Sequence, residues 1–447
     1  MSTIPFLRPG LPGDVVAWRD RAPVTRAQFR RDLAALAARL PDKPYVLNHC
    51  DDRYRFVVGL AAALSRGQVS LFPPNRATEV LAQLKRDYPG VYCLSDQAQP
   101  EEAALMETCG YDTATAAGEA ADPAFPAEQV VAIMFTSGST GVPQRHPKTW
   151  CGLTQEARIA GQRLGLDAQR GGQVLATVPA QHMYGFAFSV VMPAQWGYVI
   201  GAERPFYPED IRQALAARPG PAILVTTPVH IRACVLDGVQ LPSPDFILSS
   251  TAPPDAAPAA EAEPRYGARV VEFYGSTETG AIAARRQAET RLWRTFDGIR
   301  VAAQDGGFRV EAPYFAAPMQ LGDSVEVKNE REFELFGRNA ELVKIAGKRI
   351  ALGDLNRHLL AIDGVRDGTF FLPDAEAGRE PRLTAFVVAP GRARAQILDA
   401  LRRRIDSVFL PRPLYLVEAL PRNTTGKLPR GNLLRLFRET EEKEAAG

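Results

Sequence analysis

A run of hydroxyl residues and glycines that follows an apolar strand is the first feature of the chain that suggests chemistry. After Val130–Phe135 comes the run Thr136-Ser137-Gly138-Ser139-Thr140-Gly141-Val142-Pro143. Glycines allow backbone N–H groups to converge on an anion, and hydroxyls add neutral donors. The run therefore predicts a loop that binds a polyphosphate, with an ordinary Gly/Ser turn as the alternative. It is not a Walker loop, because Gly141, Gly347-Lys348 and Gly426-Lys427 lack the required spacing.

Four further motifs follow this loop along the chain. They are Tyr274-Gly275-Ser276-Thr277-Glu278-Thr279-Gly280, Gly322-Asp323, the stretch from Gly337-Arg338 to Ile350, and Pro421-Arg422-Asn423-Thr424-Thr425-Gly426-Lys427. With Thr136–Gly141, they resemble in kind and order the motifs of the adenylate-forming superfamily, which includes acyl- and aryl-CoA synthetases, peptide-synthetase adenylation domains and beetle luciferases. The resemblance extends from about Thr25 to Arg430. It implies an ATP-dependent ligase that joins a carboxylic acid to AMP, releases pyrophosphate and passes the acyl group to a thiol.

The resemblance also assigns the catalytic residues. Attack of a carboxylate on the α-phosphorus of ATP brings anions together, so the site must supply positive charge and a metal. By resemblance, Lys427 binds the acid and neutralises the developing charge, Glu278 holds Mg²⁺, and Thr277 contacts the α-phosphate. The alternatives are a solvated lysine in a basic tail and a carboxylate at a helix N-terminus.

The remaining nucleotide and thiol contacts are implied by the resemblance alone. Tyr274 is expected against the adenine ring, and Asp323 is expected to accept both ribose hydroxyls, with Arg338 nearby. Lys344 and Gly347 would line the channel for the thiol. The other nucleotide-binding residues implied are Thr136, Ser137, Gly138, Ser139, Thr140, Gly141, Ser250, Thr251, Ala252, Gly275 and Ser276.

The acid is predicted to bind near Pro179–Phe186. There the superfamily often places a histidine or aromatic residue beside the acyl group, which assigns His182, although a core histidine is the alternative. No aspartate lies between Gly172 and Glu209 to pair an ammonium, so an amino acid is disfavoured. Aromatic or small residues favour a flat ring, as in hydroxybenzoate, cinnamate or aryl-polyene ligases; a medium- or long-chain fatty acid is the alternative. The predicted acid-binding residues are His182, Tyr184, Gly185, Phe186, Tyr274, Gly275 and Gly280.

Several features bear on the acceptor and on whether the chain is active. No carrier domain follows Lys427, so we expect the thiol on coenzyme A or on the phosphopantetheine of a separate acyl carrier protein. The lysine usual after the phosphate loop is Gln144, with Arg145 and Lys148 close by, and the usual hinge residue aligns with Ala340 or Asn339. These departures leave an alternative, in which the chain is a catalytically silent relative that binds a nucleotide or a partner.

The elements that must position these residues alternate between helical and strand patterns. A helical pattern covers Arg26–Leu40, and β-prone runs such as Tyr45–Leu47, Ala222–Thr226 and Val270–Phe273 lie between helical stretches. This alternation predicts an α/β fold. With the resemblance, we expect a large N-terminal domain of layered sheets and helices over residues 1–338 and a small, mobile α+β C-terminal domain over residues 339–447.

Composition excludes several other classes of protein. The 447 residues are 46% hydrophobic and carry a net charge of +2, so no footprint for nucleic acid is expected. The five cysteines are scattered and indicate neither a disulfide framework nor a zinc site. The first residues lack a secretory pattern, and no long apolar run predicts a membrane span. We therefore expect a cytoplasmic protein.

Overall fold

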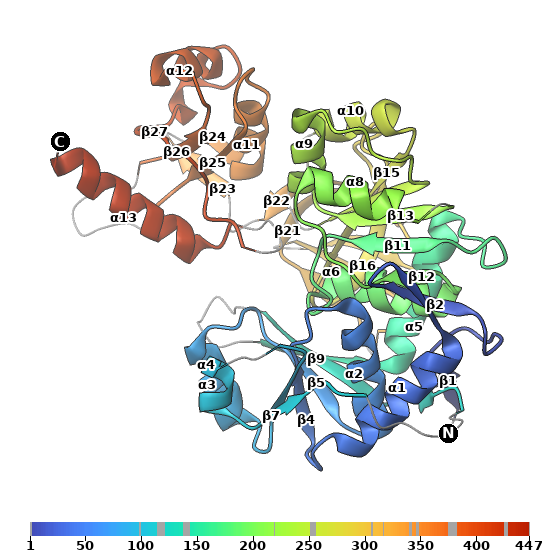
Figure 1. Ribbon diagram of the computed structural model, residues 1–447. Helices are drawn as coiled ribbons and strands as arrows, with labels where there is room; N and C mark the ends of the chain where they lie inside the picture. Colours follow the sequence, from blue (N-terminus) through green and yellow to red (C-terminus); the bar gives the residue numbers. More distant parts are fainter. Residues whose placement is uncertain are drawn as a thin grey trace.

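Two large β-sheets and the helices around them form most of the molecule (Figure 1). This computed structural model describes residues 2–97, 100–113, 121–136, 144–218, 220–250, 256–304, 307–315, 317–338, 342–345, 348–373, 382–423 and 428–446. The predicted α/β fold class is confirmed, because sheets and helices alternate along the chain in layers.

The first sheet has six strands. It is parallel except for the antiparallel pair β9–β10 at one edge, which forms a hairpin. In spatial order its strands are β10 (Gln144–Thr149), β9 (Val130–Thr136), β5 (Val69–Phe72), β4 (Tyr45–Asn48), β6 (Tyr92–Ser95) and β7 (Thr108–Gly110).

The second sheet has eleven strands, with a parallel centre and antiparallel pairs at both ends. Two of its central strands, Ala222–Thr226 and Phe246–Ser249, are buried along their whole length and mostly apolar, as expected for strands covered on both faces. In spatial order the strands are β21 (Asp323–Asn329), β22 (Glu332–Arg338), β17 (Trp293–Thr295), β16 (Gly280–Arg285), β15 (Arg269–Ser276), β14 (Phe246–Ser249), β13 (Ala222–Thr226), β11 (Gln173–Ala176), β12 (Val199–Gly201), β2 (Val15–Arg19) and β3 (Ala22–Thr25).

Helices cover these sheets, and the largest hydrophobic cluster takes residues from both sheets and from the helices between them. Local signals set several ends: Thr25 and Thr149 cap α1 and α5 through their hydroxyls, and Gly165 ends α5 in the left-handed conformation. The helices are α1 (Arg26–Arg39), α2 (Arg53–Ser65), α3 (Thr78–Asp87), α4 (Pro100–Leu105), α5 (Trp150–Leu164), α6 (Met183–Phe186), the π-helical η1 (Ala187–Val191), α7 (Met192–Trp196), α8 (Pro208–Ala216), α9 (Pro228–Asp237) and α10 (Ala256–Tyr266).

Smaller sheets complete the fold. Beyond Arg338 the elements have their own two hydrophobic clusters, whose buried members lie between Val343 and Leu433. Arg232 of α9 donates a 2.5 Å hydrogen bond to the carbonyl of Val365 in this part. The predicted domain boundary after residue 338 stays a prediction. The remaining elements are β1 (Thr3–Pro5), β8 (Ala124–Pro126), β18 (Arg300–Gln304), β19 (Gly307–Glu311), β20 (Met319–Leu321), β23 (Leu342–Ile345), β24 (Lys348–Ala351), α11 (Leu352–Leu360), β25 (Asp367–Phe371), β26 (Thr384–Val388), α12 (Arg394–Arg402), the 3-10 helix η3 (Ser407–Phe409), β27 (Leu414–Leu416) and α13 (Arg430–Ala446).

Among the residues that the structure describes, none of the helices combines the length and the apolar character needed to cross a membrane.

Candidate functional site

The tight turn between β15 and β16 presents Glu278. Ser276 and Thr279 close this turn, because the backbone N–H of each donates to the hydroxyl of the other at 3.1 and 3.2 Å. Gly280 has φ +68°, a conformation that glycine tolerates best. A Cβ at Gly275 would lie 2.0 Å from the carbonyl oxygen of Gly280, so the strands can approach this closely only with glycine there. The two glycines of the motif thus build the turn.

The β9–β10 hairpin of the other sheet meets this turn. Thr136, the last residue of β9, lies 3.0 Å from His146 of β10, measured from Oγ1 to Nε2. The same Nε2 is 3.8 Å from a carboxylate oxygen of Glu278. Lys148, two residues further along β10, donates to the backbone carbonyl of Glu278 at 2.7 Å. The start of the predicted phosphate loop and the predicted metal ligand therefore lie together where the two sheets meet.

A buried glutamate holds the other end of the turn. Glu156 of α5 accepts a 2.8 Å hydrogen bond from the backbone N–H of Ala281. A Cβ at Gly280 would lie 2.4 Å from the second carboxylate oxygen of Glu156, so any other residue there would displace this carboxylate. Lys148 and Glu156 thus each form a hydrogen bond with the backbone on one side of the turn that carries Glu278.

The charges at this junction influence one another. Burial lowers the pKa of His146 and of Lys148, although the carboxylate of Glu278 opposes the effect in both. Burial acts to raise the pKa of Glu278, but a hydrogen bond from Ser276 and the nearby cations outweigh burial and lower it. Glu278 is about one-third exposed and is an ionised oxygen donor, so it fits a hard cation such as Mg²⁺.

The pKa of Glu156 predicts that the stability of the folded state depends on pH. Burial raises the pKa of its carboxyl from 4.5 to about 7, although the N–H of Ala281 and the charge of Lys148 oppose the rise. The folded state therefore holds a proton that the unfolded state has released, so stability falls as the pH rises through this interval. Glu156→Gln should remove this loss of free energy of unfolding, which is at most about 3 kcal/mol.

Thermal unfolding at about pH 5 and about pH 8 measures this effect. The midpoint of the wild type should fall relative to that of Glu156→Gln over this range. The control is Glu326→Gln, because Glu326 is exposed and should keep the wild-type pH dependence. Parallel pH profiles for the wild type and Glu156→Gln would contradict the reasoning.

A second group of predicted residues lies along β15 and β21. The hydroxyl of Tyr274 donates to a carboxylate oxygen of Asp323 at 2.5 Å, and the Tyr274 ring packs against Trp293 and Phe333. Asp323 is paired in register with Arg338 across β21 and β22. The Ser250 hydroxyl donates to the carbonyl of Phe273 at 2.9 Å, beside Tyr274. The structure thus brings the predicted adenine and ribose contacts to neighbouring positions, while their roles stay predictions.

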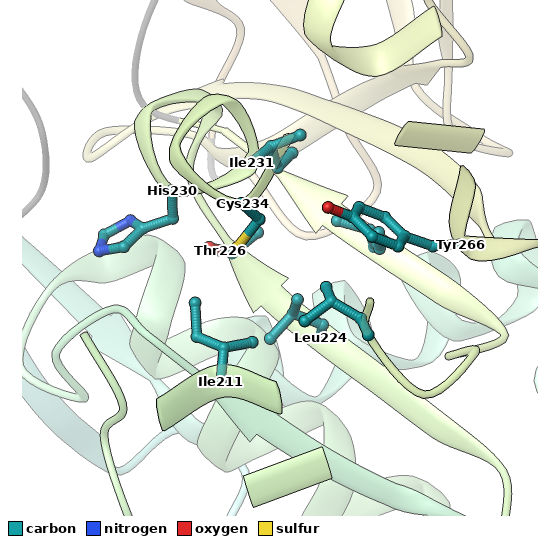
Figure 2. A pocket seen from close by; sticks show the side chains of 9 residues that line it. Ile211, Leu224, Thr226, His230, Ile231, Cys234 and Tyr266 are labelled. Carbon is teal, nitrogen blue, oxygen red and sulfur yellow. The ribbon is translucent and has the colours of Figure 1, made fainter. Parts of the chain in front are cut away.

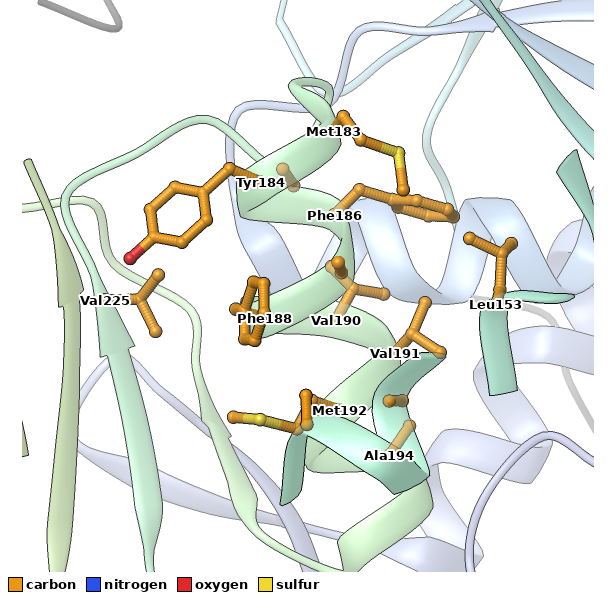
Figure 3. Packing of buried hydrophobic residues seen from close by; sticks show 14 of the residues in the cluster. Leu153, Met183, Tyr184, Phe186, Phe188, Val190, Val191, Met192, Ala194 and Val225 are labelled. Atoms are coloured by element: carbon orange, nitrogen blue, oxygen red, sulfur yellow. The ribbon is translucent and has the colours of Figure 1, made fainter. Parts of the chain in front are cut away.

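The predicted acid-binding segment forms the start of α6. His182 precedes the helix, and a Cβ at Gly185 would lie 2.0 Å from the carbonyl oxygen of Pro179. Tyr184 and Phe186 leave opposite sides of the helix (Figure 3). Phe186 has no exposed surface and packs near Phe72, at a ring-centroid distance of 5.3 Å. The two rings therefore point away from each other, and their roles in binding the acid stay predictions.

A small apolar hollow lies elsewhere on the eleven-stranded sheet (Figure 2). It is enclosed by α8, α9, α10 and the strands β13 and β14, and none of the predicted site residues lines it. Burial lowers the pKa of His230 at its edge to about 4. The Thr227 hydroxyl lies 2.9 Å from Nδ1 of the same histidine.

Part of the predicted site lies outside the residues that the structure describes. Arg338 is the last residue of β22, and Lys344 lies in β23. Residues that fall outside the described ranges are Ser137, Gly138, Ser139, Thr140, Gly141, Thr251, Ala252, Asn339, Ala340, Gly347 and Lys427.

The sequence prediction missed His146 and Glu156 and left the role of Lys148 open. Lys148 and Arg145 are both cations close to Gln144 in the sequence. Arg145 pairs instead with Asp87 of α3 at 3.5 Å and stacks on the Tyr88 ring at 5.0 Å. A polar residue on an amphipathic helix such as α5 is ordinarily solvent-facing, so Glu156 offered no distinguishing signal.

Comparison with known proteins supports the resemblance. Residues 34–302 match the model of the AMP-binding enzyme family. The chain is 30% identical over 302 residues to a 4-coumarate–CoA ligase of Halorhodospira halophila, covering 66% of this chain and 73% of the relative. It is 31% identical over 310 residues to a 4-coumarate–CoA ligase of Rhodobacter capsulatus, covering 67% of this chain and 75% of the relative.

A solved structure shares the fold. The o-succinylbenzoate CoA synthetase of Bacillus subtilis, in complex with its acyl-adenylate intermediate, superposes with a TM-score of 0.80 at 18% identity. The match covers 94% of this chain and 95% of that one.

Proposed function

The chain belongs to the AMP-binding enzyme family as an AMP-forming acid–thiol ligase, and on that premise we propose that it activates an aromatic carboxylic acid such as a hydroxycinnamate or hydroxybenzoate. The acid would be joined to the AMP portion of ATP, with release of pyrophosphate. A thiol would then displace AMP and carry the acyl group away as a thioester.

The observation that carries the adenylation step is the meeting of the two sheets at Glu278. Thr136, at the start of the phosphate loop, and Glu278 both lie within 4 Å of His146 Nε2, although they are distant in sequence. A polyphosphate bound by the loop would thus have an ionised carboxylate beside it. Mg²⁺ held there would neutralise phosphate charge. Lys148 and Glu156 hold the carboxylate in place through the backbone of the turn.

The remaining roles follow from the superfamily resemblance and from placement. Tyr274 and Asp323 would contact the adenine and ribose from neighbouring strands, with their hydrogen bond orienting both groups. Thr277 would contact the α-phosphate, and Lys427 would bind the acid carboxylate and stabilise the reacting charge. Bringing these groups to one place lowers the barrier chiefly through orientation and electrostatics.

Two observations support an aromatic acid. The relatives described above are named for 4-coumarate, a hydroxycinnamate. No aspartate lies between Gly172 and Glu209 to neutralise a substrate ammonium. By resemblance, Tyr184 is the ring that we propose to contact the acid. Like Phe186 it is buried, and its ring packs near Phe188 at a centroid distance of 5.3 Å. His182 at the start of the helix is a candidate partner for a ring hydroxyl.

Lys344 is expected to serve the thiol step rather than adenylation. By resemblance, it lies on the face of the C-terminal part that meets the thiol. Lys344→Ala should therefore keep acid-dependent pyrophosphate exchange within about twofold and slow thioester formation by about tenfold or more. Rapid-quench measurement of the two half-reactions separates these effects. Lys328→Ala, which removes an exposed lysine of β21, is the control and should leave both unchanged. Equal losses in both half-reactions would argue against a separate thiol face.

Product analysis tests the proposed function as a whole. The chain would be incubated with ATP, Mg²⁺ and a hydroxycinnamate, and then with either coenzyme A or a phosphopantetheinylated carrier protein. We expect AMP and one acyl thioester, detected by mass spectrometry. AMP formation without any thioester would point to another acceptor, and the absence of AMP with every acid would favour a silent nucleotide-binding relative.

A further inference from the structure

Three buried side chains that can bind a metal converge on the six-stranded sheet. His49 follows β4, Cys93 lies on β6, and Glu102 lies on α4; their exposed fractions are 3%, 0% and 4%. His49 Nδ1 is 2.7 Å from Glu102 Oε1, and Cys93 Sγ is 2.9 Å from Glu102 Oε2. The triangle closes with 3.6 Å between Cys93 Sγ and His49 Nδ1.

The backbone holds this cluster firmly. Leu47 and Cys93 are paired in register between β4 and β6, and the N–H of His49 donates to the carbonyl of Leu94 at 2.8 Å. Two of the three side chains therefore come from adjacent strands of a sheet. Glu102 reaches them from the short helix α4, which packs against α3. Leu105 at the end of α4 and Met106 just after it join the hydrophobic cluster that also contains Cys93.

The three side chains are close enough to share one ion. Their ligand atoms all lie within 4.8 Å of one another, and all three residues are buried. Imidazole nitrogen, thiolate sulfur and carboxylate oxygen are the atoms by which proteins bind zinc. Arg76 lies beside the cluster, where it donates to the carbonyl of His49 at 3.5 Å and pairs with Asp51 at 3.6 Å.

We propose that His49, Cys93 and Glu102 form a zinc site that ties α4 to the six-stranded sheet. A thiolate, a neutral imidazole and a carboxylate balance the two positive charges of Zn²⁺, and these ligand types are those that zinc selects. Tetrahedral zinc with ordinary bond lengths separates its sulfur and nitrogen ligands by about 3.5 Å, which matches the 3.6 Å between Cys93 and His49.

Binding changes the protonation of two of the ligands. The thiol proton leaves to solvent, and His49 moves its proton from Nδ1 to Nε2 so that Nδ1 can bind the metal. The carboxylate would then exchange its two hydrogen bonds for one metal bond. With three protein ligands, the fourth position of the tetrahedron would be left for a water. The spacing of these residues in the chain follows no zinc motif, because the fold alone brings them together.

Metal uptake by the full chain tests this site independently of ligase activity. The protein is stripped with chelator, titrated with Zn²⁺ or Co²⁺ and freed of excess metal. We expect about one metal per chain, an absorption band of cobalt–thiolate charge transfer, and a rise of roughly 2 °C or more in the unfolding midpoint with Zn²⁺.

Three variants decide the assignment. Cys93→Ala should lose the metal and the cobalt–thiolate band, and the isosteric Glu102→Gln should lower metal affinity by tenfold or more while keeping the fold. Cys109→Ser is the matched control, because Cys109 lies on the neighbouring strand β7 outside the cluster; it should bind as the wild type does. The proposal is overturned if wild-type protein takes up no more metal than Cys93→Ala, or if Glu102→Gln binds with wild-type affinity. Should Cys93→Ala fail to fold, Glu102→Gln decides alone.

Discussion

Lys427→Ala is expected to reduce acid-dependent pyrophosphate exchange by at least two to three orders of magnitude, roughly the effect of removing one electrostatic stabiliser of a transition state. The carboxylate and the α-phosphate are both anionic, and the lysine charge offsets their repulsion only as the new bond forms. Because the effect belongs to the transition state, ATP affinity should change by no more than about threefold.

Two other lysine variants make this test specific. Lys443→Ala removes an exposed lysine of α13 from the same basic part of the chain and should leave exchange unchanged. Lys427→Arg keeps the charge but alters its geometry, so it should restore only part of the activity. Near wild-type exchange in Lys427→Ala would show that the lysine is one more solvated charge.

The second large effect concerns the acid. We expect 4-hydroxycinnamate to exceed tyrosine in kcat/KM for pyrophosphate exchange by at least about two orders of magnitude. The two acids share a ring, a hydroxyl and chain length, and tyrosine differs chiefly in its ammonium group. Leaving that ammonium unpaired in a desolvated site costs several kcal/mol, and no aspartate between Gly172 and Glu209 can pair with it.

Further acids separate charge from shape. Dihydro-4-hydroxycinnamate lacks both the ammonium group and the planar double bond. Its rate relative to that of 4-hydroxycinnamate therefore reports the effect of the planar double bond alone. Palmitate tests the fatty-acid alternative. If tyrosine equals or exceeds 4-hydroxycinnamate, the assignment of an aromatic acid fails, although adenylation itself could still hold.

Much of the fold could be predicted from the sequence, because its local signals are strong. The apolar run Ala222–Thr226 is the strand β13 with the same bounds. The helical pattern at Arg26–Leu40 is α1, which Thr25 caps and which ends at Arg39 before Pro41. The start of the next helix shows the limit of such patterns: α2 begins at Arg53, capped by Asp52, ahead of the apolar run that starts at Phe56. Capping residues set such boundaries, and apolar patterning does not record them.

The candidate site could be predicted only in part. Motifs identify Glu278 because its neighbours occur in a recognisable order, but they say nothing of the residues that hold it. Lys148 and Glu156 reach the turn from other elements, and only the folded arrangement brings them there.

Tyr184 and Phe186 show a second limit of sequence reasoning. They stand two apart in a motif and were assigned one role. In a helix, two residues span about 200°, so their side chains point to opposite sides. Both rings are buried but have different neighbours: Tyr184 packs near Phe188, and Phe186 packs near Phe72.

Acid-dependent ATP–pyrophosphate exchange tests the central claim most directly, since it reports formation of the acyl-adenylate without requiring any thiol acceptor. With ATP, Mg²⁺ and 4-hydroxycinnamate or a hydroxybenzoate, we predict exchange at least about tenfold above the background without acid, and loss of that exchange in Lys427→Ala. Exchange no greater than background with every aromatic acid, in folded protein that binds ATP, would contradict the account.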